Sequence, residues 1–313
     1  MSSVCPLCKT EAKFLFNTKD HNEKITDQVF AYWQCSDCQL IFLPDIPANL
    51  GEYYQESYYE IPSLENLSRI ASANEYQINF ILKFVTSGNL LEIGPSFGTF
   101  SLQAKKAGFK VDVIEMDKRC CEFLSKSVGV NAVNSNCPEQ AIDNLGKHDV
   151  IALWHNIEHL PNPWAFLTEA AKNLNPGGVL LIAAPNPSSF GFRVLGPLWP
   201  HVDAPRHLNL IPVQLLTKYL NSAGLELVMM TTKDKGARSW NRFGWQRFLM
   251  NYFSSKIGQM AAFIVGGILS LPLALWEFKG VNGSAYTAIY QKKSIDDRHL
   301  REKSQAKTPV DGP

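Results

Sequence analysis

The chain has 313 residues, of which 45% are hydrophobic and 19% are charged, enough apolar material for a full core and an accessory module. Its 30 Lys and Arg residues oppose 29 Asp and Glu residues, which leaves a net charge of +1. This balance excludes a generic electrostatic attraction to nucleic acid. The beginning of the sequence has no basic segment followed by an apolar run, so we expect no secretory signal and a reducing, cytoplasmic location.

Four of the seven cysteines form two C-x-x-C pairs near the start of the sequence, Cys5 with Cys8 and Cys35 with Cys38. In a reducing compartment, two such pairs favour a metal site over disulfides, and four thiolates form the tetrahedral shell that Zn²⁺ prefers. We therefore expect residues 1–46 to form a zinc ribbon, with a redox pair as the alternative. A module of this size needs the metal in order to fold.

A connector and a helix are expected over residues 47–88. Residues 53–59 of the connector are rich in tyrosine. These side chains either close over a ligand cleft as a lid or pack the ribbon onto the main domain, and the sequence favours neither. Apolar residues at helical spacing predict a helix over residues 63–85 that lies against a sheet.

The segment Leu90–Phe100 predicts a strand, a tight turn and the start of a helix. Gly94 and Gly98 suit a turn in which the backbone approaches a ligand, because a Cβ there restricts φ and blocks the approach. The helix that opens after the turn presents unpaired N–H groups to an anion. The next predicted strand ends at Glu115, near the spacing of about 20 residues at which an acidic side chain accepts the hydroxyls of a ribose.

With these residues the chain resembles the class I S-adenosylmethionine (SAM)-dependent methyltransferases, whose first motif reads acidic-x-Gly-x-Gly-x-Gly. Ser96 replaces the middle glycine and leaves less room beside the methionine part of the cofactor. The resemblance covers about residues 90–292 and includes Leu-x-Pro-Gly-Gly at residues 174–178. It implies a Rossmann-like seven-stranded sheet over residues 89–293. The residues implied for cofactor binding are Glu92, Gly94, Pro95, Ser96, Gly98, Glu115, Met116, Asn136, Cys137 and Trp154.

Alternating strands and helices predict a sheet with helices on both faces. Its further strands are expected at residues 111–114, 132–133, 149–154, 179–183, 225–231 and 285–290. Ligands of such a sheet lie beyond the carboxyl ends of the strands, so the glycine turn, Glu115, Asn136 and residues 155–159 should converge on one cleft. Asn136 stands where the family usually has an acidic or amide residue facing the adenine, and its amide serves that end.

Residues 155–159 read H-x-x-E-H, which is also a zinc-protease signature. That signature needs a long helix, whereas two prolines follow within four residues, so a protease is not expected. The segment is closer to the Glu-x-x-Glu-His of ubiquinone-type O-methyltransferases, which can hold a divalent cation. Glu158 and His159 match that pattern and His155 replaces the first acid. A cation at Glu158 and His159 is therefore an option, although Mg²⁺ prefers oxygen ligands.

The sequence Asp-x-Pro-Arg-His-Leu at residues 203–208 recurs in bacterial methyltransferases of this branch. It offers a base near neutral pH at His207 and a guanidinium fork at Arg206 for an anionic substrate. Methyl transfer to a hydroxyl needs an aligned acceptor and a base, for which His207 and His159 are the candidates. In the structural alternative, His207 caps the loop and Arg206 pairs with Asp203. The candidate catalytic set is His155, Glu158, His159, Arg206 and His207.

Residues 237–280 form an apolar, helical insertion before the last strand. Aromatic residues alternate there with four basic ones, and residues 257–276 follow without a charge, over the length of a membrane span. The flanking strands belong to one sheet, so the chain must return, which predicts a re-entrant hairpin with membrane contact through residues 238–276. A cap over the substrate cleft and a homodimer interface are the alternatives. Residues 294–313 are expected to be a disordered tail.

Together these features predict a cytoplasmic SAM-dependent methyltransferase with a zinc ribbon, which membrane contact would place on the inner face of the cytoplasmic membrane. The expected acceptor is an oxygen of a small sugar-like or lipid-linked molecule. An RNA methyltransferase that grips RNA with the ribbon is a second hypothesis, but the balanced charge of the ribbon argues against a nucleic-acid partner. A non-catalytic, SAM-binding scaffold is a third.

Overall fold

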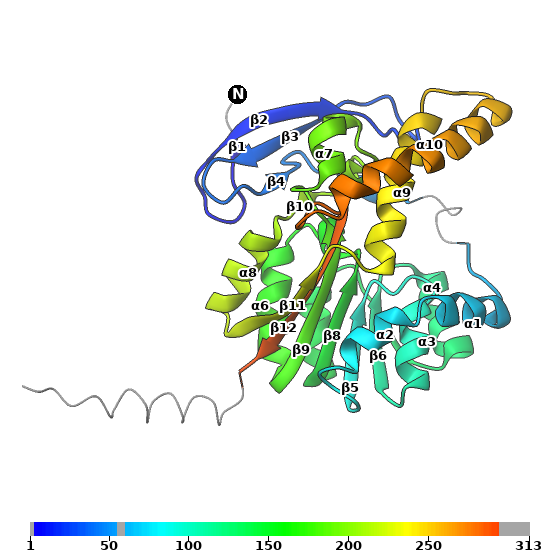
Figure 1. The fold of residues 1–313 in the computed structure, drawn as a ribbon. Helices are drawn as coiled ribbons and strands as arrows, with labels where there is room; N and C mark the ends of the chain where they lie inside the picture. Colours follow the sequence, from blue (N-terminus) through cyan, green and yellow to red (C-terminus); the bar gives the residue numbers. More distant parts are fainter. Residues whose placement is uncertain (1–2, 55–59, 294–313) are drawn as a thin grey trace, which may run out of the picture.

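The computed structural model describes residues 3–54 and 60–293. Its larger sheet has seven strands in the order β11-β12-β9-β8-β5-β6-β7 (Figure 1). The strands are β5 (Asn89–Ile93), β6 (Lys110–Glu115), β7 (Asn131–Asn134), β8 (His148–Trp154), β9 (Leu174–Pro185), β11 (Leu225–Thr231) and β12 (Ala285–Lys292). Strand β12 runs antiparallel to its neighbours β9 and β11, whereas β5 to β9 are parallel. The predicted seven-stranded sheet is confirmed.

Helices cover both faces of this sheet, and an apolar cluster fills each interface. The central strands β8 and β9 are therefore apolar on both sides, as buried parallel strands are. One face carries α1 (Leu64–Ala73), α2 (Tyr76–Ile81), α3 (Thr99–Lys106), α4 (Lys118–Phe123) and the π-helical turn η3 (Leu124–Val128). The other carries α5 (Pro138–Ala141), η4 (Ile142–Leu145), α6 (Pro163–Asn173) and α8 (Val213–Ser222).

The single helix expected over residues 63–85 is two helices, α1 and α2, separated at Asn74. The buried side chain of Gln103 explains the break. Its Nε2 donates to the carbonyls of Ala71 and Asn74, at 3.0 and 3.1 Å, and its Oε1 accepts from the N–H of Ile78 at 3.2 Å. These bonds replace helical ones where the chain bends.

A second sheet joins the N-terminal module to the main domain. Its order is β1-β2-β3-β4-β10, and β10 (Asn209–Leu210) comes from the segment after β9. The other strands are β1 (Ser3–Val4), β2 (Glu11–Thr18), β3 (Phe30–Cys35) and β4 (Ile41–Phe42), and η1 (Leu50–Tyr53) follows. Phe30 and Tyr32 share a buried cluster with Trp199 and Leu208. The ribbon thus packs its core against the segment that precedes β10.

The segment between β9 and β10 contains helix α7 (Phe190–Leu195) and the turns η6 (Gly196–Leu198) and η7 (Pro200–Val202). Ser189 caps α7, because its Oγ accepts from the N–H of Phe192 at 3.1 Å. Phe192 and Leu195 then pack onto the ribbon cluster. Contact with the ribbon therefore orders a segment that has no clear periodicity of its own.

The predicted helical insertion between β11 and β12 is confirmed: it consists of α9 (Lys235–Met250) and α10 (Lys256–Glu277), which pack as a hairpin. The re-entrant turn expected in the uncharged stretch 257–276 is wrong, because α10 runs through this stretch as one continuous helix. Asp234 and Ser255 cap the two helices through their side chains. In the part of the chain that the structure describes, α10 alone has the length and apolar composition to cross a membrane. The hairpin projects at the top right of Figure 1. The predicted tail and residues 55–59 of the connector lie outside the described residues.

Candidate active site

The turn between β5 and α3 requires glycine at two positions. Gly94 has φ +62° and Gly98 has φ +86°, in the left-handed region. A Cβ on Gly94 would lie 1.9 Å from Nδ2 of Asn156, and one on Gly98 would lie 2.4 Å from a methyl group of Leu124. Ser96 also has a positive φ, +55°. The serine therefore adopts a left-handed conformation, which favours glycine.

Glu115 fixes this turn to the end of β6. Its carboxylate accepts from the backbone N–H of Ser96 and of Asp117, both at 2.9 Å. Burial is the main influence on its pKa and raises it. Glu92 on β5 is buried, and its carboxyl group accepts a hydrogen bond from the hydroxyl of Ser101. Burial raises the pKa of Glu92 to about 8.

A cavity of about 210 Å³ lies at the carboxyl ends of β5, β6, β7 and β8, and we call it the first cavity. Six predicted cofactor residues line it: Gly94, Ser96, Glu115, Met116, Asn136 and Trp154. The other four, Glu92, Pro95, Gly98 and Cys137, are not on its wall. His155, Asn156, His159 and Tyr54 also line it. The predicted convergence of four loops on one cleft is thus present in the structure.

The segment after β8 presents two histidines to the first cavity and turns Glu158 inward. It forms a single 3-10 turn, η5 (Ile157–His159), instead of the long helix of a protease motif. The Glu158 side chain is 1% exposed, and neither carboxylate oxygen has a hydrogen-bond partner among the described residues. Burial raises its pKa to about 8. Its Oε1 lies 3.9 Å from Nδ1 of His155 and 4.0 Å from Nε2 of His207.

His159 is held by its Nδ1 atom. This nitrogen lies 3.0 Å from the backbone oxygen of Arg206 and 2.9 Å from the hydroxyl of Tyr54. A carbonyl only accepts, so we assign the ring proton to Nδ1 and the lone pair to Nε2. Burial lowers the pKa of His159 to about 3. The ring is therefore neutral at physiological pH, with a lone pair on Nε2.

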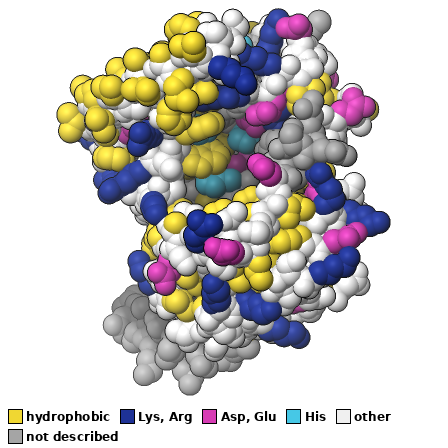
Figure 2. Space-filling model, turned by 90° about the vertical axis from the view of Figure 1, so that its right-hand side faces the viewer, with side chains coloured by type: hydrophobic (Ala, Val, Ile, Leu, Met, Phe, Trp, Pro, Cys, Tyr) yellow, Lys and Arg dark blue, Asp and Glu magenta, His cyan; other side chains and the backbone are white. Residues whose placement is uncertain are grey.

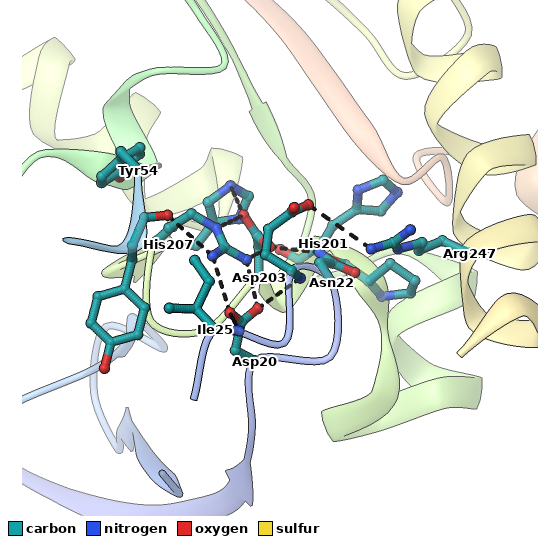
Figure 3. A network of polar contacts seen from close by, with 12 residues as sticks. Asp20, Asn22, Ile25, Tyr54, His201, Asp203, His207 and Arg247 are labelled. Atoms are coloured by element: carbon teal, nitrogen blue, oxygen red, sulfur yellow. Dashed lines mark hydrogen bonds and ion pairs between the residues drawn. The ribbon is translucent and has the colours of Figure 1, made fainter. Parts of the chain in front are cut away.

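Arg206 does not meet a substrate, contrary to the role expected of it. Its guanidinium is 0% exposed and is bonded to the carboxylates of Asp20 and Asp203, which are labelled in Figure 3. Nε and Nη2 donate to Asp203 at 3.0 and 2.6 Å, and Nη2 and Nη1 donate to Asp20 at 2.8 and 3.4 Å. Nη1 also reaches the backbone oxygen of Tyr53 at 3.5 Å. The structural alternative holds: Arg206 positions the loop, and one of its partners comes from the ribbon.

His207 lies behind His159 and does not line the first cavity. Its Nδ1 is 2.8 Å from the backbone oxygen of His201, and its ring packs edge-on to that of His159 at 4.6 Å. The ribbon fixes its backbone, because the Tyr32 hydroxyl donates to the His207 oxygen at 2.8 Å. The ligand atoms of Glu158, His159 and His207 lie within 4.8 Å of one another, so this group can hold a metal ion.

A family model described as "Methyltransferase domain" matches residues 67–229, more than half of the chain. The chain belongs to this family. Its domain is that of a SAM-dependent methyltransferase, and SAM is the cofactor expected from the family. The match includes every element around the first cavity except the ribbon connector.

Curated relatives of this methyltransferase domain include two proteins called ubiquinone biosynthesis O-methyltransferase. The one from Xanthomonas oryzae pv. oryzae (strain PXO99A) is 25% identical over 119 residues, 36% of this chain and 50% of the relative. The one from Vibrio parahaemolyticus serotype O3:K6 is 23% identical over 133 residues, 39% of this chain and 57% of the relative. The chain spans about half the length of the curated relatives it matches.

Among solved structures, phosphoethanolamine N-methyltransferase 2 of Haemonchus contortus, crystallised with SAM, aligns with 81% of this chain and 62% of its own. Its sequence identity is 13% and the TM-score is 0.53. This likeness shows the fold.

Sequence reasoning missed two aromatic partners of the methyltransferase site, His201 and Trp240. The indole of Trp240 on α9 stacks on the rings of His155 and His201, with centroid distances of 3.9 and 4.4 Å. Nothing in the sequence links these residues, which lie on three separate segments. The same is true of Asp20 and Asn22, which reach the Asp203 loop from the ribbon.

A second cavity, of about 570 Å³, adjoins the methyltransferase site on the side of α9. Its wall includes Tyr76, Thr99, His155, His201, Trp240 and Phe243. His155 lines both cavities. Figure 2 shows a hollow with histidine side chains in its floor, below a broad group of hydrophobic side chains.

The four cysteines of the ribbon lie together at the ends of two similar turns. The first turn closes with the Lys9 N–H on the Cys5 oxygen at 3.1 Å, and the second with the Gln39 N–H on the Cys35 oxygen at 3.2 Å. Both Lys9 and Gln39 have a positive φ. The four sulfur atoms lie within 4.8 Å of one another, so the cluster can hold a metal ion.

Proposed function

We propose that the protein transfers the methyl group of SAM to a hydroxyl oxygen of a small sugar-like or lipid-linked acceptor. One observation carries the proposal. A single cavity brings the glycine turn and Glu115 of a SAM-binding domain face to face with a neutral imidazole, that of His159.

The residues of the first cavity fit the parts of SAM. Glu115 would accept the ribose hydroxyls, and Asn136 would face the adenine. Gly94 lines the cavity without a side chain of its own, so its backbone would face the methionine part. Bound SAM supplies a methyl group that is already activated, so the protein must align the acceptor and remove its proton.

His159 is the base in this proposal. Its Nδ1–H is held by the Arg206 oxygen, so Nε2 takes the proton of the acceptor hydroxyl. Its low pKa keeps the lone pair free at neutral pH. His207 and Glu158 lie next to it, with the ligand atoms of the three residues within 4.8 Å of one another.

A divalent cation on Glu158, His159 and His207 is the second option at this site. The unpartnered oxygens of Glu158 favour it, because a buried carboxylate normally has a partner. One carboxylate and two imidazoles suit zinc or another transition metal better than Mg²⁺. His159 would then be a ligand instead of a base. Metal analysis of a Cys-ribbon variant, before and after dialysis against a chelator, separates the two options.

We further propose that the ribbon cysteines hold structural Zn²⁺. The Cys8–Cys35, Cys5–Cys38 and Cys8–Cys38 sulfur distances are 3.3, 3.6 and 3.8 Å. Four thiolates at about 2.3 Å from a tetrahedral zinc ion lie about 3.8 Å apart. The cluster is therefore near the size that the ion requires.

Calorimetry with SAM tests cofactor binding. Replacing Glu115 with alanine should weaken the affinity roughly 10- to 100-fold, because two hydrogen bonds to a charged acceptor are lost. The matched control is Glu122→Ala, since Glu122 is exposed on α4 and pairs with Lys126. An unchanged affinity in Glu115→Ala would refute the cofactor assignment.

Transfer is tested with methyl-labelled SAM and a cell extract that is afterwards separated into lipid and soluble fractions. His159→Gln should bind SAM normally but transfer label about 10²- to 10⁴-fold more slowly, the usual contribution of a general base. If SAM binds and no fraction gains label, the scaffold hypothesis replaces the enzyme. Label in RNA would instead favour the RNA methyltransferase.

A further inference from the structure

Helix α10 turns its small residues inward and its large apolar residues to solvent. Ala262, Gly266 and Ser270 are buried against α9. A Cβ on Gly266 would lie 2.6 Å from the Cα of Gln246, so the two helices touch through their backbones. This is the inverse of a helix that packs on a water-soluble core, where the large apolar side chains are the buried ones.

The exposed side chains form one continuous stripe, which we call the outer face of α10. Its members recur every three or four residues: Ile257, Met260, Ile264, Ile268, Leu271 and Leu275. Ile257, Leu271 and Leu275 are 85%, 71% and 75% exposed. At about 1.5 Å per residue the helix is about 33 Å long, so the stripe is far larger than the scattered apolar residues of an ordinary surface.

Aromatic and basic residues border the outer face. Tyr252 and Phe253 precede α10 and Trp276 ends it, and all three are exposed. The hairpin from 235 to 281 has six basic residues and one acidic residue, Glu277. Glu277 is buried and accepts from Nε1 of Trp245 at 2.8 Å, so the exposed charge of the hairpin is positive. Aromatic ends and basic borders are typical of helices that lie in a membrane interface.

We propose that the outer face of α10 docks on an anionic membrane and that the second cavity receives a lipid-linked acceptor from it. The protein would thus be peripheral on the cytoplasmic membrane. Phe243 connects the two features, because it is exposed on α9 and also lines the second cavity. Figure 2 shows the hollow directly below the hydrophobic side chains, with basic residues along their border.

The path to the methyltransferase site then leads past His155. This residue lines both cavities, and its ring stacks on Trp240 of the same helix that supports α10. A polar head group can enter the second cavity while its lipid chain stays at the apolar surface. The entry of the acceptor through the second cavity rests on the proposed methyl-transfer reaction. The docking of the outer face on a membrane does not depend on that reaction.

Vesicle flotation of the full chain tests the docking. The protein should float with vesicles of phosphatidylcholine and phosphatidylglycerol, and binding should weaken with added salt and with phosphatidylcholine alone. Each basic residue at an anionic surface changes partitioning about fivefold. The double variant Ile264→Glu/Ile268→Glu should lose at least tenfold in vesicle binding, while SAM affinity by calorimetry and the melting temperature stay unchanged. The matched control is Val228→Glu, at an exposed valine of β11.

Two outcomes would overturn the proposal. One is vesicle binding that the double variant leaves intact. The other is an absence of vesicle binding, in either oligomeric state of the chain. If the chain then forms a dimer that the double variant dissociates, the outer face binds a second copy of the chain instead of a membrane. Loss of SAM binding with intact vesicle binding would instead count only against the methyltransferase reaction. If both proposals hold, the double variant also loses label transfer to the lipid fraction.

Discussion

Replacing Asp20 with alanine should destabilise the whole protein, although Asp20 lies in the ribbon and far from the cofactor residues in sequence. Its buried carboxylate bonds two nitrogens of the Arg206 guanidinium, at 2.8 and 3.4 Å. It also accepts from the N–H groups of Glu23 and Ile25, at 3.0 and 3.1 Å. The substitution therefore leaves part of a buried cation and two backbone donors without their acceptor.

The expected loss follows from these contacts. Removing one partner of a buried ion pair costs about 3–5 kcal/mol. Arg206 keeps its two bonds to Asp203, which favours the lower end, whereas the two backbone donors each add about 1 kcal/mol. We expect the free energy of unfolding in urea to fall by about 3–5 kcal/mol, and by about 2 kcal/mol in Asp20→Asn, which keeps one acceptor oxygen.

A control variant and a measurement of methyl transfer complete the test of Asp20. Asp27→Ala removes an exposed carboxylate from the same ribbon, whose pair with Lys19 is also exposed, and should leave the unfolding curve in place. Because the Arg206 oxygen holds His159, Asp20→Ala should also slow methyl transfer more than it weakens SAM binding. A loss of unfolding free energy below about 1 kcal/mol would show that the ribbon does not support the site in this way.

Three further predictions concern the glycine turn, the buried carboxyl group and the metal. Gly94→Ala should weaken SAM binding about tenfold or more, because φ is +62° and the new Cβ meets Asn156. Gly51→Ala is the control and should leave SAM binding unchanged, because the space around Gly51 is open. Equal affinities of the two variants would contradict this geometry. The pKa of Glu92 is raised to about 8, so the contribution of this residue to stability is lost as pH rises from about 4.5 to 8. In Glu92→Gln, the free energy of unfolding should therefore fall less over this pH range, by at least about 1.4 kcal/mol, which corresponds to one pKa unit. Parallel pH profiles of the variant and the unchanged protein would rule this out. Cys35→Ser should lower bound zinc and expose the segment 199–210 to proteolysis, whereas Cys137→Ser should retain the metal; full zinc content in Cys35→Ser would exclude the cluster as the site.

The local sequence was enough to predict the parts of the site that lie at the ends of neighbouring strands of the sheet. Gly94, Gly98 and Glu115 follow consecutive strands, and the carboxyl ends of parallel strands meet at one edge, so their meeting could be predicted. The helical nature of the insertion could be predicted as well, whereas the place where its chain turns back, between α9 and α10, could not. The break at Asn74 could not, because it depends on Gln103, a residue of another helix.

The role of Arg206 shows where prediction from the sequence stops. A guanidinium beside a histidine suits a substrate site and a structural ion pair equally well, and only the position of Asp20 separates the two. Likewise, no spacing indicates that Trp240 stacks on His155 and His201, or that His155 lines two cavities.

The sequence by itself determined the methyltransferase fold, the glycine turn and the four-cysteine module of this protein, because each depends on residues close together in the chain or on strand order. Only the tertiary structure decided that the ribbon holds the loop of Arg206 and His207, that Trp240 stacks on His155 and His201, and that α10 exposes its large apolar side chains. These features depend on contacts between distant segments, and such contacts form only when the whole chain packs.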